Sequence, residues 1–227
     1  MDSAVADMFG FHALQLGLPE LDALGTNRMP HQWLANHSPT PGADFLTDFS
    51  ALPFQANSLD LVVLPHTLEL SADPHTTLRE VERVLVPEGR AVICGFNPVS
   101  LWGLRQQRAR LYHRMGFEKA FLPHKEFIGY WRLRDWLRLL GFEVEVGRFG
   151  CYRPALSSDK WLKRFAWMDP LGDRWWPVLG AVYFLVAVKR VHGMTLLSPS
   201  WRLARVPANV PVSVAGKLIN TPARGQK

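Results

Sequence analysis

The sequence predicts a single α/β domain with a mostly parallel sheet, helices on both faces and a basic C-terminal tail. Three observations support this fold class: apolar runs of strand length, a capped amphipathic helix between two of these runs, and a globular composition with 48% hydrophobic and 20% charged residues. A chain of 227 residues is long enough for one such domain with a full core. We expect the domain to span residues 1–194 and the tail to span residues 195–227.

The first expected elements are short. Residues 11–17, FHALQLG, predict the first strand, and Pro19 then suits the start of a short helix that ends by Leu24. Residues 29–35 predict a second strand and residues 44–48 a third. The beginning of the chain should therefore contribute several short strands, separated by polar loops.

The clearest pattern follows these strands. Residues 59–65, LDLVVLP, form an almost continuous apolar run, as expected for a parallel strand buried on both faces. Asp73 and Pro74 suit the N-cap and first position of an amphipathic helix. After a Pro-Glu-Gly turn, residues 90–96, RAVICGF, predict the next buried strand. This order of elements predicts parallel pairing through right-handed crossovers.

The downstream half alternates helices and strands less regularly. Residues 99–129 are basic with interspersed aromatic side chains, and we expect a helix or lid in this basic aromatic insert. Residues 130–140 predict an amphipathic helix, residues 142–149 an alternating strand, and residues 180–189 the last buried strand. Residues 151–177 are rich in Trp, Pro and Arg and show no pattern that identifies an element.

Charge is distributed unevenly along the chain. Residues 1–98 carry 4 Lys and Arg against 12 Asp and Glu, whereas residues 99–134 carry 8 against 2 and residues 195–227 carry 5 against none. The downstream positive charge would suit an anionic partner such as RNA or a membrane surface, or it forms a solvated face. Because the sequence contains no recognised RNA-binding motif, nucleic acid is the less favoured partner.

The sequence predicts a cytoplasmic protein without a transmembrane segment or a metal site. The longest apolar run, residues 178–188, is shorter than the roughly 20 residues that a transmembrane helix needs, and it fits a buried strand. The start, MDSAVADMFG, lacks the basic region of a signal peptide. Cys94 and Cys151 have neither a disulfide framework nor a metal-ligand spacing, and both fit a reducing compartment.

A series of short motifs carries a family resemblance. It comprises Asp48 after a strand, LPF at 52–54, SLDLV at 58–62 and LREVERVLVPEGR at 78–90. This series resembles the second half of the type 11 class I S-adenosylmethionine (SAM) methyltransferase domain. The stretch RDWLRLLGFEVEV at 134–146 is similar to the helix that precedes the sixth strand in that family. The resemblance implies a Rossmann-like sheet, SAM as cofactor and methyl transfer as the activity.

The resemblance also implies a SAM site at the carboxyl ends of the parallel strands. Asp48 would accept a hydrogen bond from the adenine amino group, and Phe49 would pack on the adenine ring. The loop that begins at Leu64 would lie beside the sulfonium, and the turn at Gly17 would approach the methionine moiety. The implied cofactor contacts are Leu16, Gly17, Leu18, Asp48, Phe49, Leu64, Pro65 and His66.

The first half of the chain departs from the family pattern at two contacts. Gln15 replaces the acid that usually precedes the glycine-rich turn, and the sequence LPE replaces its remaining glycines, so this motif is degenerate. Residues 29–41 contain no acid for the ribose hydroxyls, which Asn36 or His37 would have to hold more weakly. These departures leave open whether the chain binds SAM tightly.

No motif identifies a catalytic base. His66 and Glu69, which follow the strand at 59–65, are weak candidates for proton removal, and His124 is a third. Each of the three also fits a structural or surface role. Trp102 and neighbouring aromatic and arginine residues could line an acceptor pocket, or they could be ordinary helix packing.

Three functions remain. The first is a SAM-dependent methyltransferase, an enzyme that acts on a small-molecule or lipid-like acceptor. The second is a methyltransferase-fold binding protein that has lost its cofactor site, and the third is an RNA-associated methyltransferase. The motifs between residues 44 and 98 favour the first, the altered glycine-rich turn favours the second, and only positive charge supports the third. The sequence indicates neither the acceptor nor the oligomeric state.

Overall fold

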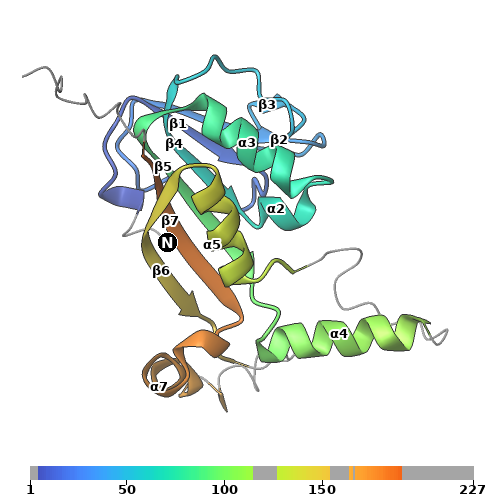
Figure 1. Cartoon of the computed structure of the whole chain (residues 1–227). Helices are drawn as coiled ribbons and strands as arrows, with labels where there is room; N and C mark the ends of the chain where they lie inside the picture. Colours follow the sequence, from blue (N-terminus) through green and yellow to red (C-terminus); the bar gives the residue numbers. More distant parts are fainter. Residues whose placement is uncertain (1–4, 115–126, 154–163, 166, 191–227) are drawn as a thin grey trace, which may run out of the picture. The chain divides into compact units, whose positions relative to one another are not determined.

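The computed structural model describes residues 5–114, 127–153, 164–165 and 167–190. Contacts within the chain divide it into two units, Met1–Val191 and His192–Lys227, and all described residues belong to the first. The predicted tail at 195–227 lies outside the described residues. The first unit is built on one seven-stranded sheet with the strand order β3-β2-β1-β4-β5-β7-β6 (Figure 1).

The sheet is mostly parallel, and it has the fold class that the sequence predicts. Its strands are β1 (His12–Leu16), β2 (His31–Asn36), β3 (Phe45–Leu46), β4 (Leu59–Pro65), β5 (Leu85–Phe96), β6 (Phe142–Gly150) and β7 (Val182–Lys189). Strand pairs from β3 to β5 are parallel, and β7 is antiparallel to both of its neighbours. Because β1 pairs with both β2 and β4, the winding of the chain reverses there, which creates the switch point of a doubly wound sheet.

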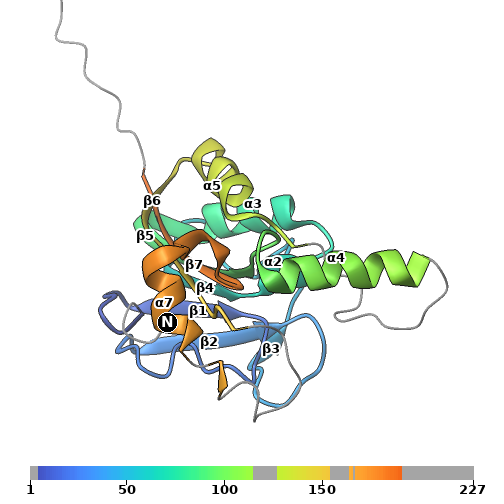
Figure 2. The ribbon, with the colours of Figure 1, turned by 90° about the horizontal axis from the view of Figure 1, so that it is seen from below.

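Two helices, α3 (Pro74–Val84) and α5 (Tyr130–Leu139), cover the same face of the sheet (Figure 2). The helical elements of the chain are α2 (Thr67–Leu70), α3 (Pro74–Val84), α4 (Leu101–Arg114), α5 (Tyr130–Leu139), α7 (Met168–Trp175) and the 3-10 helix η1 (Pro177–Leu179). Leu78 of α3 and Leu133 of α5 are fully buried in the main core beneath them. Asp73 accepts hydrogen bonds from two backbone N–H groups of the first turn of α3, so the predicted N-cap is confirmed.

The other face of the sheet, around β1, is covered mostly by turns and bends, together with the helical residues 5–6. A second core cluster joins Val5, Met8, Ala23, Leu24 and Met29 to Ala13, Leu61 and Val63 of the sheet. The predicted short helix between Pro19 and Leu24 is wrong, because residues 17–30 form turns and bends without a helix. A proline at a suitable position is only a local signal, and here side-chain hydrogen bonds described below fix a different path for the chain.

β7, the last strand among the described residues, lies in the interior of the sheet between β5 and β6. Lys189, at its end, is only 8% exposed, and its Nζ donates to the carbonyl oxygens of Glu82 at 2.6 Å and Leu85 at 2.9 Å. The same amine forms an ion pair with the Glu82 carboxylate at 3.0 Å. Lys189 therefore ties β7 to the segment where α3 ends and β5 begins.

Most downstream elements agree with the sequence predictions. The predicted strands at 59–65, 142–149 and 180–189 and the helix at 130–140 are confirmed, with bounds that differ by at most two residues. By contrast, β5 begins at Leu85, earlier than predicted, because the Pro-Glu-Gly turn is an irregularity within the strand. Helix α7 lies in the part of the chain for which the sequence identified no element. None of the described helices has the length and apolar character that crossing a bilayer requires.

Candidate cofactor site

Polar loops follow the parallel strands at a single edge of the sheet. Gly17 follows β1, His37 follows β2 and Asp48 lies just beyond β3. His66 follows β4, and Asn97 follows β5. Because the carboxyl ends of parallel strands meet at the same edge, these loops surround the switch point between β1 and β4. This edge is where the implied cofactor residues should lie.

Three of these loops meet at Gly17. The φ angles of Gly17 and Leu18 are 77° and 45°, so both residues have the left-handed conformation. A Cβ atom on Gly17 would lie 3.5 Å from Thr67 Oγ1 and 3.6 Å from Phe49 Cζ, which is ordinary contact. The Thr67 hydroxyl, which is fully buried, donates a hydrogen bond to the Leu16 carbonyl. The turns after β1, β3 and β4 are therefore in direct contact.

Gln15 organises the altered turn after β1. Its side chain is 1% exposed, and its amide nitrogen lies within hydrogen-bond distance of the carbonyl oxygens of Gly17 (3.3 Å), Leu18 (3.1 Å) and Leu21 (2.6 Å). Its amide oxygen accepts from the backbone N–H of Ala23 at 3.0 Å. An acid in this place could accept but could not donate to carbonyl groups. The glutamine therefore fits the loop that replaces the usual glycine-rich turn.

The loop after β2 uses its polar groups internally. Asn36 is 5% exposed; its amide nitrogen donates to Thr40 Oγ1, and its amide oxygen accepts from the backbone N–H of His37 at 2.9 Å. His37 is exposed and packs edge-on against Phe49, with ring centroids 5.7 Å apart. Phe49 itself is 3% exposed and belongs to the main core. The residue at the expected ribose position is thus already bonded to the protein.

Asp48 lies exposed beyond the end of β3, as the sequence predicts for an adenine contact. Its carboxylate accepts from the backbone N–H of Ser50 at 2.9 Å. This hydrogen bond, together with one from the Ser50 side chain, lowers the pKa of Asp48 below its ordinary value. Asp48 is therefore ionised at neutral pH and can accept a further hydrogen bond from a ligand.

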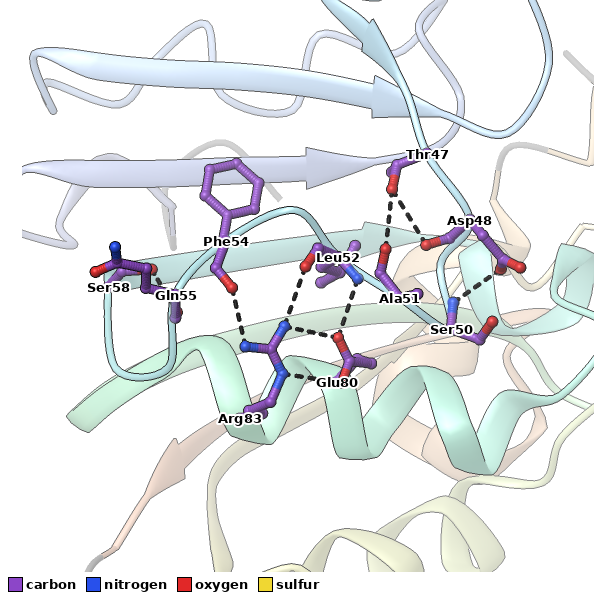
Figure 3. A network of polar contacts seen from close by, with 10 residues as sticks. All are labelled: Thr47, Asp48, Ser50, Ala51, Leu52, Phe54, Gln55, Ser58, Glu80 and Arg83. Atoms are coloured by element: carbon purple, nitrogen blue, oxygen red, sulfur yellow. Dashed lines mark hydrogen bonds and ion pairs between the residues drawn. The ribbon is translucent and has the colours of Figure 1, made fainter.

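The LPF turn that follows Asp48 is held by two residues of α3 (Figure 3). Glu80 accepts from the backbone N–H of Leu52 at 3.0 Å. Arg83 donates to the carbonyl oxygens of Leu52 at 3.0 Å and Phe54 at 2.9 Å, and it forms an ion pair with Glu80 at 2.8 Å. The hydrogen bond between the two side chains lowers the pKa of Glu80 and raises that of Arg83. The sequence motif of α3 thus connects the helix to the turn beside Asp48.

His66 and Glu69 form a partly buried pair after β4. His66 Nδ1 donates to Glu69 Oε2 at 3.0 Å, and the other oxygen of Glu69 accepts from the backbone N–H of Phe96. Burial alone would lower the pKa of His66, but the hydrogen bonds to Cys94 and Glu69 and their charges outweigh it and raise the pKa to about 9. At neutral pH His66 is therefore an imidazolium and a hydrogen-bond donor. In that state it cannot accept a proton, and Glu69 is the group that orients it.

The other residues that the sequence singled out lie in separate surroundings. Leu64 and Pro65 are buried in β4, so that their backbone rather than their side chains borders the site. Trp102 donates through Nε1 to the Arg153 carbonyl at 2.8 Å, and its ring stacks on Phe96 at 6.3 Å. His124 lies outside the described residues. Thr67 was not predicted as a site residue, because its contact with Leu16 depends on the pairing of β1 with β4.

Comparisons with known proteins agree with this architecture. A family model described as a methyltransferase domain matches residues 23–93. A curated relative, the uncharacterized protein YafS of Escherichia coli K12, is 33% identical over 192 residues, which cover 83% of this chain and 72% of the relative.

Solved structures share the fold at lower identity. A SAM-dependent methyltransferase of Thermotoga maritima, described as a possible histamine N-methyltransferase, has a TM-score of 0.59 at 15% identity, over 83% of this chain and 87% of its own. A putative methyltransferase of Haloferax volcanii, solved in complex with the activator Trm112, has a TM-score of 0.57 at 21% identity, over 83% and 88%. The solved structures show the class I methyltransferase fold, and the family model together with the curated relative leads to one assignment: the chain belongs to the family with a type 11 methyltransferase domain.

Proposed function

We propose that this chain binds SAM at the carboxyl edge of its sheet and transfers the methyl group to a small-molecule or lipid-like acceptor. The contact of three turns at Gly17 is the observation that carries the proposal, since it joins the loops after β1, β3 and β4 at the switch point. Ligands of open α/β sheets bind in the crevice outside the carboxyl ends of the strands, at this kind of position.

Each proposed contact has a physical role. The backbone of Leu16, Gly17 and Leu18 would border the methionine moiety, because this left-handed turn lies at the switch point of the sheet. Asp48 would accept from the adenine amino group, and Phe49 would contact the ring. The backbone of Leu64 and Pro65 and the His66 side chain would lie beside the reacting centre. SAM supplies the electrophilic methyl group when bound, and the protein orients the acceptor and excludes water.

The residues fit the adenine end of SAM better than its ribose. Asp48 is exposed and ionised, whereas the Asn36 amide is already bonded to Thr40 and His37. A hydrogen bond to a charged group contributes roughly 1.5–3 kcal/mol. Without a carboxylate at the end of β2, we expect SAM to bind about ten- to a hundredfold more weakly than at a site that has one.

A binding protein of this fold without catalysis is the second candidate. Two observations favour it: Phe49 is 3% exposed, so that its ring is covered by protein, and Gln15 closes the turn after β1 on itself. In this case the edge of the sheet would keep its shape without accepting the cofactor.

Calorimetric titration of the full chain with SAM and with its demethylated product separates the two candidates. We expect saturable binding, and ligand at about a hundred times its dissociation constant should raise the free energy of unfolding by roughly 2.7 kcal/mol. Asp48→Ala should weaken binding at least about tenfold through the loss of a charged hydrogen bond. Asp135→Ala removes an exposed acid from α5 and is the matched control.

Two results would count against the proposal. Equal affinity of the wild-type protein and Asp48→Ala would show that the assigned site is wrong. Absence of binding to both ligands in the wild-type protein would favour the second candidate.

A further inference from the structure

A second surface exposes a cluster of apolar side chains. Six of the fifteen large hydrophobic residues that are exposed in the described part of the chain lie on the first turns of α4 and on α7 and its flanks. They are Leu101, Leu104, Trp167, Leu171, Trp175 and Trp176, and we call them the α4–α7 surface. Leu101 and Leu104 are three residues apart on one helix and therefore share a side of it. Clustered exposed apolar residues of this kind mark interaction sites.

The α4–α7 surface surrounds a hollow. A cavity of about 580 Å³ is lined by five of its six residues together with Tyr152 and a few neighbours. This volume lies within the range of pockets that hold small molecules or parts of lipids. Trp175 and Trp176, at its rim, are 68% and 58% exposed. An acyl chain or the interfacial layer of a membrane could therefore reach both the hollow and the indole rings around it.

Helix α7 is held in place, so that its exposed tryptophans are presented by a fixed element. A Cβ on Gly172 would lie 2.2 Å from Tyr152 Cγ, which means that the helix packs closely on this ring and tolerates only glycine there. Asp169 accepts from the backbone N–H of Tyr152 at 3.1 Å and from Arg153 Nε at 2.7 Å. The aromatic side chains of α7 thus remain exposed although the helix itself is anchored.

Positive charge accompanies the apolar residues. The sequence of α4 contains arginines and no acid, and Arg105 and Arg108 follow Leu104 with exposed side chains. On α7, Arg174 is exposed beside Trp175, and the sequence of this helix also contains Asp169 and Asp173, so that the excess of positive charge lies on α4. The Asp169 carboxylate is paired with Arg153 at 2.7 Å and does not offset these charges. The described part of this surface therefore combines indole rings, aliphatic side chains and arginines.

We infer that the α4–α7 surface docks onto a bilayer that contains anionic phospholipids. Tryptophan prefers the interface between headgroups and acyl chains, and arginines beside it gain from the negative surface potential of such lipids. RNA would match the arginines and rings but would leave the leucines and the apolar hollow unused. The inference does not require SAM binding. It adds a membrane location to the proposed activity. Asn97, at the end of β5, donates to the carbonyl oxygens of Val178 and Gly180, so the α4–α7 surface adjoins the carboxyl edge of the sheet.

Vesicle co-sedimentation of the full chain without SAM tests the inference. We expect binding to vesicles of phosphatidylcholine mixed with phosphatidylglycerol, weaker binding to phosphatidylcholine alone, and a decrease as salt rises. The double variant Trp175→Gln and Trp176→Gln should bind at least about tenfold more weakly, because two indoles leave the interface. Trp131→Gln, which changes a 60% exposed tryptophan of α5, is the matched control and should bind like the wild-type protein.

A charge variant keeps the test independent of the indoles. Arg108→Glu and Arg174→Glu together should reduce binding to the anionic vesicles at least about tenfold and leave the weaker binding to phosphatidylcholine unchanged. The inference is overturned if neither double variant differs from the wild-type protein. It is also overturned if the wild-type chain does not bind the vesicles. Dimer formation or RNA binding that depends on Trp175 and Trp176 would then identify the partner of this surface.

Discussion

The two halves of the candidate cofactor site are held in place by different kinds of contact. In the half that carries the family motifs, a capped helix, α3, holds the turn beside Asp48 through Glu80 and Arg83. In the half that departs from the family, buried amides bind irregular backbone. Gln15 holds the turn after β1, and Asn27 donates to the carbonyl oxygens of Val5 at 2.7 Å and Met8 at 3.2 Å. A regular helix therefore supports one half of the candidate site, whereas side-chain hydrogen bonds support the other.

The difference shows how a fold can persist while a binding motif changes. A glycine-rich turn leaves its backbone groups free for a ligand, whereas the Gln15 amide binds the same kind of groups within the protein. The sheet requires only that these backbone groups have hydrogen-bond partners, and either a ligand or a side chain can provide them. Four predictions test this contrast.

Gln15→Leu should have the largest effect. It removes hydrogen bonds to three carbonyl groups and one N–H group of the turn, and each lost hydrogen bond costs about 1 kcal/mol. The Leu18 and Leu21 carbonyls and the Ala23 N–H keep backbone partners, whereas the Gly17 carbonyl loses its side-chain donor. We expect a loss of about 4 kcal/mol in the free energy of unfolding, measured by denaturant titration. Gln15→Glu should also destabilise, because a carboxylate cannot donate. Gln55→Leu, at an exposed position, is the control, and a stable Gln15→Leu variant would contradict the contrast.

The His66 pair should make stability depend on pH. The pKa of His66 rises from 6.5 to about 9 in the folded protein, so its stabilising effect is complete below pH 6.5 and is lost as the pH rises through about 9. Wild-type protein should lose about 3 kcal/mol over this interval relative to His66→Gln. Denaturant unfolding of both proteins at several pH values measures the difference. Parallel pH profiles for the two would mean that His66 is not charged in the folded state.

Arg83→Met should have a smaller effect on the motif-bearing half. The variant loses two hydrogen bonds to the LPF turn and the pairing with Glu80, but the arginine is partly exposed, so we expect a loss of about 1.5 kcal/mol. Arg79→Met changes an exposed arginine of the same helix and should be close to neutral. Thermal unfolding of the two variants compares them. An equal change in both would show that the turn is held by other contacts.

Asn36→Asp should have the smallest effect of the four, a modest increase in SAM affinity. The carboxylate can still accept from the His37 backbone, and the Thr40 hydroxyl can donate to it in place of accepting. A carboxylate at the end of β2 would then be available to ribose hydroxyls, and we expect SAM affinity to rise about fivefold, or about 1 kcal/mol. Calorimetry measures this, with Ser38→Asp as the control for added charge. No gain would indicate that the loop does not face the ribose.

The same difference between the two halves determined which elements could be predicted from the sequence. The bounds of β4 and the cap of α3 follow from local signals, an apolar run and an Asp-Pro pair, and both predictions are confirmed. The helix expected from Pro19 is absent because the buried Gln15 side chain, through its hydrogen bond with Ala23, determines the path of that loop. Local propensity does not reveal such a contact. Helix α7 was missed because its exposed tryptophans obscure the helical pattern, and its anchor to Tyr152 is a tertiary contact.

The candidate site follows the same logic. The position of Asp48 could be predicted because the LPF motif fixes it relative to a strand end. The roles of Gln15 and Thr67 could not, since both depend on which strands become neighbours. The assignment of the cofactor contacts themselves stays a prediction that ligand titration will decide.

The position of β7 has a consequence for biosynthesis. Of the strands in the described sheet, β7 is the last to be synthesised, yet it lies between β5 and β6, and Lys189 forms contacts with the beginning of β5. During translation, the edge of β5 therefore stays without its partner until β7 has emerged from the ribosome. An unpaired interior edge can associate with other chains. A ribosome that pauses before β7 would thus hold a nascent domain in an aggregation-prone state, with six of the seven strands of the described sheet complete.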